Sequence, residues 1–196
     1  MEHKLSLIVC NRLLKNDVIT EDMKDIYVYG FDLLFSFLIS TSIIITIGLI
    51  TGHALQTFLF LITFILVRRY TGGYHANTYL KCQIYTVTFY LLVTGLSLYV
   101  NIFHYIFVIL ELIGVLIILI WGPIDNPHKP LTKTEKKKHK ITGLILFSLV
   151  WIAGITIKLY NNILGNTLFY TLALIIILMI VPLFERRIKN EEVTED

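Results

Sequence analysis

The polar stretch at residues 68–82, RRYTGGYHANTYLKC, stands between two long apolar runs, and such runs decide the fold. Of the 196 residues, 56% are hydrophobic and only 16% are charged, and the charges are clustered instead of spread evenly. Soluble domains carry more charge than this and fewer apolar residues. The composition therefore predicts an integral membrane protein built as one compact bundle.

Six apolar runs come close to the roughly 20 residues that an α-helix needs to cross a bilayer. The connections near residue 50 and at Asn101 are very short, which predicts antiparallel neighbours on either side of each. The second run is the shortest and contains Gly52 and His53, so a re-entrant segment is an alternative to a full crossing there. The six predicted spans are residues 29–49, 51–67, 82–100, 102–121, 141–157 and 164–183.

The predicted fold is an all-α integral membrane protein with about six transmembrane helices, preceded by an amphipathic interfacial helix. The leader, residues 1–28, mixes leucines and isoleucines with charged residues such as Lys4 and Arg12. A helix of this kind lies in the interface with its apolar side in the lipid. A soluble leader packed on the bundle is the alternative. Residues 29–183 then form the membrane domain, and residues 184–196 form a polar cytoplasmic tail.

The positive-inside rule orients these spans. With both termini in the cytoplasm, all 17 basic residues except Lys158 fall in cytoplasmic segments. This bias favours six crossings, and it places the 68–82 segment and the basic loop at 122–140 on the same, cytoplasmic side. The lysines of the loop suffice as an orientation signal, and they also suit an acidic partner segment or anionic lipid.

Two carboxylates fall inside the predicted spans, where ionised side chains are costly and often functional. Asp32 is near the cytoplasmic end of the first span, from which it can reach the lipid headgroups. Glu111 is in the middle of the fourth span, which predicts that it is protonated or paired inside the bundle. A polar path through both residues would suit a small multi-span transporter, which is the alternative function. A non-catalytic adaptor that presents the basic loop is a third interpretation.

His75 and Cys82 are the residues of the polar stretch that suit nucleophilic chemistry. The thiolate is the reactive form of cysteine, and a neighbouring histidine commonly generates it. Cys82 begins a predicted helix, whose N-terminus favours a negative sulfur. On one continuous helix the seven-residue step would separate the two by about 10.5 Å along the axis. The chain must therefore bend between them if they form a pair, and Gly72 and Gly73 supply freedom just before the histidine.

Further assignments follow from position. Asp125 and Asn126 lie in a proline-stiffened loop on the same side of the membrane, and either is a candidate to orient His75. A backbone N–H at the start of the third span, or the Arg68 guanidinium, is a candidate donor to an oxyanion. Cys10, in the leader, is the weaker competing nucleophile.

No cofactor, metal or nucleic-acid partner is predicted. A catalytic zinc site uses about three protein ligands, and only a histidine and a cysteine stand together in the polar stretch. His53 and His104 fall on the outer side in the predicted topology, whereas His128 and His139 fall on the cytoplasmic side and keep a metal site as a weak alternative. A cysteine that only fills space in a membrane helix is the simplest alternative for Cys82.

These residues resemble the accessory gene regulator protein B (AgrB) family of Gram-positive bacteria. The amphipathic leader and the multi-span plan also fit, so the resemblance covers nearly the whole chain. The matching elements are the Arg68-to-Gly73 approach, Gly73-x-His75, the seven-residue step to Cys82, and the later Gly122-Pro123-x-Asp125-x-Pro127 with Lys129-Pro130.

The resemblance implies a cysteine endopeptidase embedded in the cell membrane, with its active site on the cytoplasmic side. Cys82 would be the nucleophile and His75 its general base, with Arg68 and Gly73 as supporting residues. The substrate would be a small AgrD-like precursor peptide on the membrane. Attack would release the acidic C-terminal tail of the peptide, and the acyl-enzyme thioester would pass to a Cys or Ser side chain within it. The product would be a thiolactone or lactone quorum-sensing signal, and the enzyme a homodimer.

Overall fold

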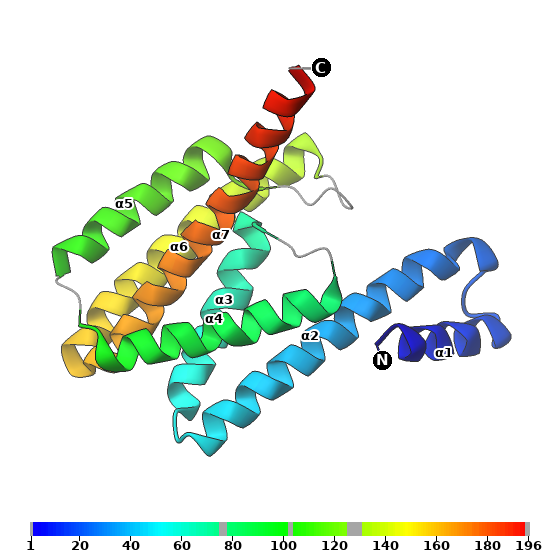
Figure 1. Ribbon diagram of the computed structural model, residues 1–196, viewed down its shortest axis with the longest axis horizontal. Coiled ribbons are helices and arrows are strands. Elements are labelled where there is room, and N and C mark those ends of the chain that lie inside the picture. Colours follow the sequence, from blue (N-terminus) through cyan, green and yellow to red (C-terminus); the bar gives the residue numbers. More distant parts are fainter. Residues whose placement is uncertain (1, 75–77, 102–103, 125–130, 195–196) are drawn as a thin grey trace.

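The computed structural model of the protein describes residues 2–74, 78–101, 104–124 and 131–194, which are helical apart from short connections. Figure 1 shows α5, α6 and α7 on one side of the molecule, α3 and α4 in the middle, and α1 and α2 on the other side. The helices are α1 (Glu2–Lys15), a 3₁₀ helix η1 (Glu21–Met23), α2 (Lys24–Ile50), α3 (Ala54–Thr71), α4 (Tyr79–Tyr99), α5 (His104–Trp121), α6 (Lys133–Tyr160) and α7 (Asn162–Thr194).

Five helical segments in the described ranges are long and apolar enough to cross a membrane. They comprise η1 with α2, then α3, α4, α6 and the first part of α7; α5 is also apolar but shorter. The prediction of an all-α membrane protein is thereby confirmed. Six full crossings and cytoplasmic termini remain predictions.

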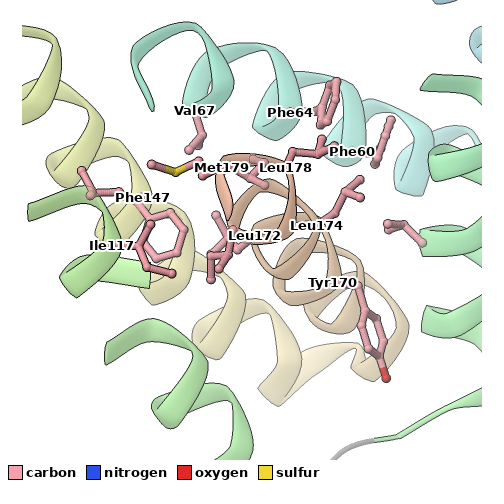
Figure 2. Close-up of a cluster of buried hydrophobic side chains, with 14 of the residues drawn as sticks. Phe60, Phe64, Val67, Ile117, Phe147, Tyr170, Leu172, Leu174, Leu178 and Met179 are labelled. Carbon is pink, nitrogen blue, oxygen red and sulfur yellow. The ribbon is translucent and has the colours of Figure 1, made fainter. Parts of the chain in front are cut away.

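The helix α7 is the centre of the bundle. In its most apolar window 61% of the residues are buried, against 17% to 39% in the other candidate spans. Phe60, Phe64 and Val67 of α3 and Phe147 of α6 belong to the buried cluster that surrounds α7 (Figure 2). Because lipid tails are as apolar as these side chains, close packing supplies most of the stabilisation here. Packing against α7 therefore determines where α3, α4, α5 and α6 lie.

The leader is two helical pieces and not the single amphipathic helix predicted for residues 1–28. Asp17 has a positive φ of 55°, and the N–H groups of Asp17 and Val18 donate to the carbonyls of Leu14 and Leu13 at 3.0 Å each. This is a Schellman-type ending, in which aspartate tolerates the left-handed conformation. The chain then turns back, so α1 packs along the start of α2 (Figure 1).

The predicted basic loop is partly helical, because α6 begins at Lys133. Thr132 and Glu135 form a capping box: the Thr132 N–H donates to Glu135 Oε2 at 2.9 Å, and the Glu135 N–H donates to Thr132 Oγ1 at 3.3 Å. Such a box satisfies two N–H groups that a helix start leaves unpaired. The lysines from 133 onward therefore line the first turns of a helix, and the amine of Lys140 donates to the Leu119 carbonyl in the last turn of α5.

Buried polar residues join the helices at the opposite end of α3. Gln56 Nε2 donates to Ser97 Oγ of α4 at 2.8 Å and to Thr167 Oγ1 of α7 at 3.4 Å. The Lys158 ammonium is also buried there and donates to Asn166 Oδ1 at 2.8 Å. In a membrane, such bonds hold helices together where the hydrophobic effect does not.

Candidate functional site

Cys82 lies in the first turn of α4. The Thr78 side chain caps this helix by accepting a hydrogen bond from the Lys81 N–H at 3.3 Å. The Cys82 N–H donates to the Thr78 carbonyl at 3.0 Å, and the residue is half-buried. The positive end of a helix macrodipole favours a negative sulfur at such a position. The expected placement of Cys82 at a helix start is confirmed by this geometry.

Arg68 of α3 is brought to the same place. Its guanidinium lies near enough to Cys82 to interact electrostatically with a thiolate there. One of its terminal nitrogens donates to the Tyr74 carbonyl, and the guanidinium carbon lies 5.0 Å from the centre of the Phe64 ring. Its Nε is buried and has no hydrogen-bond partner among the described residues. Arg68 therefore holds the chain beside Cys82 and retains a donor.

Two contacts dock the segment 71–74 onto distant parts of the bundle, and a third joins it to the end of α3. The Ile124 N–H donates to the Thr71 carbonyl at 3.0 Å, within an isolated parallel bridge between Gly72 and Ile124. The Tyr74 N–H donates to the Leu178 carbonyl of α7 at 2.8 Å. Arg68 provides the third contact, at the Tyr74 carbonyl. Both the N–H and the carbonyl of Tyr74, the residue directly before His75, are thereby hydrogen-bonded.

Both glycines of the pair are required by this docking. Gly72 has φ 73° and ψ −155°, a region that only glycine adopts readily. A Cβ on it would lie 2.2 Å from the Ile124 carbonyl oxygen. Gly73 has φ 136°, and a Cβ there would lie 3.0 Å from the Leu178 carbonyl oxygen. The glycines thus permit close approach of backbone to backbone, which is a stricter role than the flexibility predicted from the sequence.

The Tyr74 side chain connects this segment to α4. Its ring centre lies 6.5 Å from that of Tyr85, which is three residues after Cys82 on the same helix. His75 follows Tyr74 directly in the chain. The residues His75, Asp125 and Asn126 themselves lie outside the described part of the structure.

A polar cluster ties α1 to the helix turn that carries Cys82. Gln83 Nε2 donates to Glu2 Oε1 at 2.6 Å and to Ser36 Oγ at 3.3 Å. His3 Nδ1 and Asp32 Oδ2 lie 3.0 Å apart, and Asp32 is only 4% exposed. Asp32 therefore faces α1 and does not reach the headgroups as predicted, because the leader folds back over it. Gln83, the residue after Cys82, is consequently hydrogen-bonded to both α1 and α2.

Cys10 differs sharply from Cys82 in its surroundings. It is fully buried between α1 and α2, in a small cluster with Ile19 and Val28. Burial, together with the nearby Asp32 carboxylate, raises the pKa of the Cys10 thiol above its ordinary value. A raised pKa means less thiolate near neutral pH, so Cys10 is a poor nucleophile.

Glu111 belongs to a separate place in the bundle. Its Oε1 accepts a hydrogen bond from Ser148 Oγ of α6 at 3.1 Å, and it lines a small apolar pocket between α5, α6 and α7. Asp32, by contrast, is on α2, at the other side of the molecule in Figure 1. The two carboxylates predicted to share a transport path therefore stand in different clusters.

Several residues at the site were missed by sequence reasoning. Tyr74, Ile124 and Leu178 make their docking hydrogen bonds through backbone atoms, and such contacts leave no residue-type signal. Gln83 was missed because a lone glutamine in an apolar run is not distinctive. One available signal was Pro182, since a proline inside an apolar run leaves a carbonyl of its helix without its usual partner.

The fold and the site together define a polytopic helical membrane protein with a half-buried thiol at a helix start and a cation beside it. The chain belongs to the accessory gene regulator B family, whose pattern matches residues 6–184. The resemblance recognised in the sequence is thereby confirmed.

Curated relatives agree with this assignment. The chain is 29% identical to a putative AgrB-like protein of Clostridium perfringens strain SM101 over 188 residues, which cover 91% of this chain and 87% of the relative. It is 29% identical to accessory gene regulator protein B of Staphylococcus intermedius over 122 residues, which cover 61% of this chain and 65% of that protein. No solved structure matches the chain significantly.

Proposed function

We propose that this protein is a membrane-embedded cysteine endopeptidase that matures a quorum-sensing peptide. Family membership supports a role in processing the AgrD-like precursor of agr quorum sensing. In this proposal the enzyme removes the C-terminal tail of the precursor and promotes its closure to a thiolactone or lactone. Cys82 is the nucleophile and His75 is the general base.

One observation carries the proposal: the chain leading to His75 is fixed in place near the helix that bears Cys82. Arg68 donates to the Tyr74 carbonyl, and its guanidinium is near enough to Cys82 to interact electrostatically with a thiolate there. The Tyr74 ring also packs near Tyr85 on the helix of Cys82. Because His75 is bonded directly to Tyr74, the seven-residue step in sequence is compatible with a side-chain pair.

The first half of the reaction is an acyl transfer to sulfur. His75 takes the proton of the Cys82 thiol, and the thiolate attacks the carbonyl carbon of the peptide bond after the future ring. The negative charge that develops on the carbonyl oxygen is stabilised by Arg68, whose Nε has no partner among the described residues, or by a backbone N–H at the start of α4. The C–N bond then breaks, and the imidazolium returns the proton to the leaving amine.

The second half closes the ring. A thiol or hydroxyl of the bound peptide attacks the thioester carbonyl, its proton passes to His75, and Cys82 leaves as thiolate. A thioester conserves the acyl group in an activated form that hydrolysis would destroy, so a site partly shielded from water favours cyclisation. Cys82 is half-buried, and the next residue, Gln83, is hydrogen-bonded to Glu2 of α1. This position is consistent with such shielding.

Orientation and partners belong to the same proposal. The active site faces the cytoplasm, where the predicted topology places almost all basic residues. The exposed lysines in the first turns of α6 suit the acidic tail of a precursor peptide. The enzyme acts as a homodimer in the bilayer.

The test is co-expression with a tagged candidate precursor, followed by mass spectrometry and gel shift. Cys82→Ser, Cys82→Ala and His75→Ala should each abolish cleavage, and only the wild type should form a thiol-sensitive peptide adduct. Cys10→Ser is the matched control, because it removes the other thiol and should leave cleavage intact. Normal cleavage by Cys82→Ala would overturn the proposal.

A further inference from the structure

Pro182 is the one proline inside a helix of the described chain, and it alters the hydrogen bonding of α7. In an α-helix each N–H donates to the carbonyl four residues earlier. Proline has no N–H, and its ring pushes against that carbonyl. The carbonyl affected by Pro182 is that of Leu178, one turn earlier and buried in the core.

This carbonyl finds its partner outside the helix. The Tyr74 N–H donates to the Leu178 oxygen at 2.8 Å, a distance typical of a good N–H···O bond. Gly73 permits the approach, since a Cβ there would lie 3.0 Å from the same oxygen. The Leu178 oxygen therefore lacks its usual donor within the helix and accepts from the Tyr74 N–H instead.

We propose that Pro182 is a positioning residue for catalysis: by leaving the Leu178 carbonyl without a helical donor, it provides the acceptor that fixes the main chain at Tyr74, directly before His75. The inference rests on the proposed function of His75. Proline acts here through the backbone of the neighbouring segment and touches no substrate. It links the central helix of the bundle to the candidate base.

The direct test is Pro182→Ala in the full chain in nanodiscs. Alanine restores an N–H at position 182 and is the best helix former, so the variant should fold with unchanged or raised thermal stability. Its new N–H competes for the Leu178 oxygen. Hydrogen–deuterium exchange at the Tyr74 amide should therefore become about tenfold faster, the equivalent of losing one net hydrogen bond.

The catalytic readout separates positioning from folding. With the tagged precursor, kcat of the Pro182→Ala variant should fall by about tenfold while KM changes by less than about twofold, because the geometry of the base and not substrate binding is affected. If Pro182 had only a structural role, the Pro182→Ala replacement would lower thermal stability. It would leave exchange at the Tyr74 amide and kcat of the folded fraction unchanged.

A shifted proline is the matched control. The double variant Pro182→Ala/Leu183→Pro keeps a proline in the same turn but affects the carbonyl of Met179 in place of that of Leu178. It should behave like Pro182→Ala, and full recovery of kcat would overturn the inference by showing that any bend in α7 suffices.

The two proposals fail in different ways. Unchanged Tyr74 exchange in Pro182→Ala overturns the present inference and leaves the proposed function standing if Cys82→Ala and His75→Ala are inactive. Full cleavage by those two variants overturns the proposed function, whereas the exchange measurement still decides whether Pro182 docks Tyr74.

Discussion

Replacing Gly72 by alanine should undock the segment before His75 without unfolding the bundle. Gly72 adopts φ 73° and ψ −155°, and holding a non-glycine residue there costs about 1–3 kcal/mol. The new Cβ would also lie 2.2 Å from the Ile124 carbonyl oxygen, so the two segments must separate. Their separation breaks the bond between the Ile124 N–H and the Thr71 carbonyl, which contributes about 1 kcal/mol.

Together these effects disfavour the docked state by about 2–4 kcal/mol. Each 1.36 kcal/mol corresponds to a factor of ten, so the cleavage rate should fall by roughly 30-fold to 1,000-fold. Thermal unfolding in detergent should change less than the cleavage rate, because most of the core packing around α7 involves residues other than Gly72 and its partner Ile124. The assay is precursor cleavage, with the melting temperature measured on the same preparation.

Two other glycines provide matched controls. Gly52 has φ 75° but nothing lies within 4 Å of its would-be Cβ, so Gly52→Ala tests backbone strain alone at a distant turn. Gly95 is helical with the same open space, so Gly95→Ala should be neutral or stabilising. If Gly72→Ala cleaves the precursor as fast as Gly95→Ala does, close approach to Ile124 is not needed and the reasoning is refuted.

Three further predictions concern residues away from the docked segment. Cys10 should react with a maleimide more slowly than Cys82 near neutral pH and should catch up as the pH rises, because its raised pKa keeps it protonated; mass spectrometry of labelled peptides compares the two. Gly114→Ala should destabilise the packing of α5 by about 1–3 kcal/mol, since its Cβ would lie 2.4 Å from Phe147 Cζ, and Phe147→Leu in the same chain should recover part of that loss in a double-mutant cycle of melting temperatures. Lys158→Met should lower stability by about 1.5–3 kcal/mol, measured in detergent, because it removes charged hydrogen bonds to Asn101 and to the buried Asn166.

Each of these has an outcome that contradicts it. Equal labelling rates for the two cysteines at every pH would remove the distinction drawn between their sites. Additive effects at Gly114 and Phe147 would mean that the two residues are not in contact. A Lys158→Met variant as stable as an exposed control, Lys137→Met, would show that the buried ammonium is dispensable.

Sequence reasoning predicted the class of fold and the placement of Cys82 at a helix start, because both depend on local signals. Bilayer thickness fixes how long an apolar helix must be, so the apolar runs predicted the membrane helices. A cysteine directly before an apolar run had to stand at a helix start, and Cys82 does. The same local logic failed for residues 1–28, where the left-handed turn at Asp17 splits the leader.

The amino-acid sequence by itself therefore determined that this chain is a helical membrane protein with a polar Arg68–Cys82 segment, and it carried the family pattern. Only the tertiary structure decided which atoms hold that segment. The Leu178 carbonyl accepts from Tyr74, and Asp32 is covered by α1, although these partners are far apart in the chain. Backbone hydrogen bonds between distant segments depend on how helices pack, and packing around α7 is a property of the whole chain that no local pattern encodes.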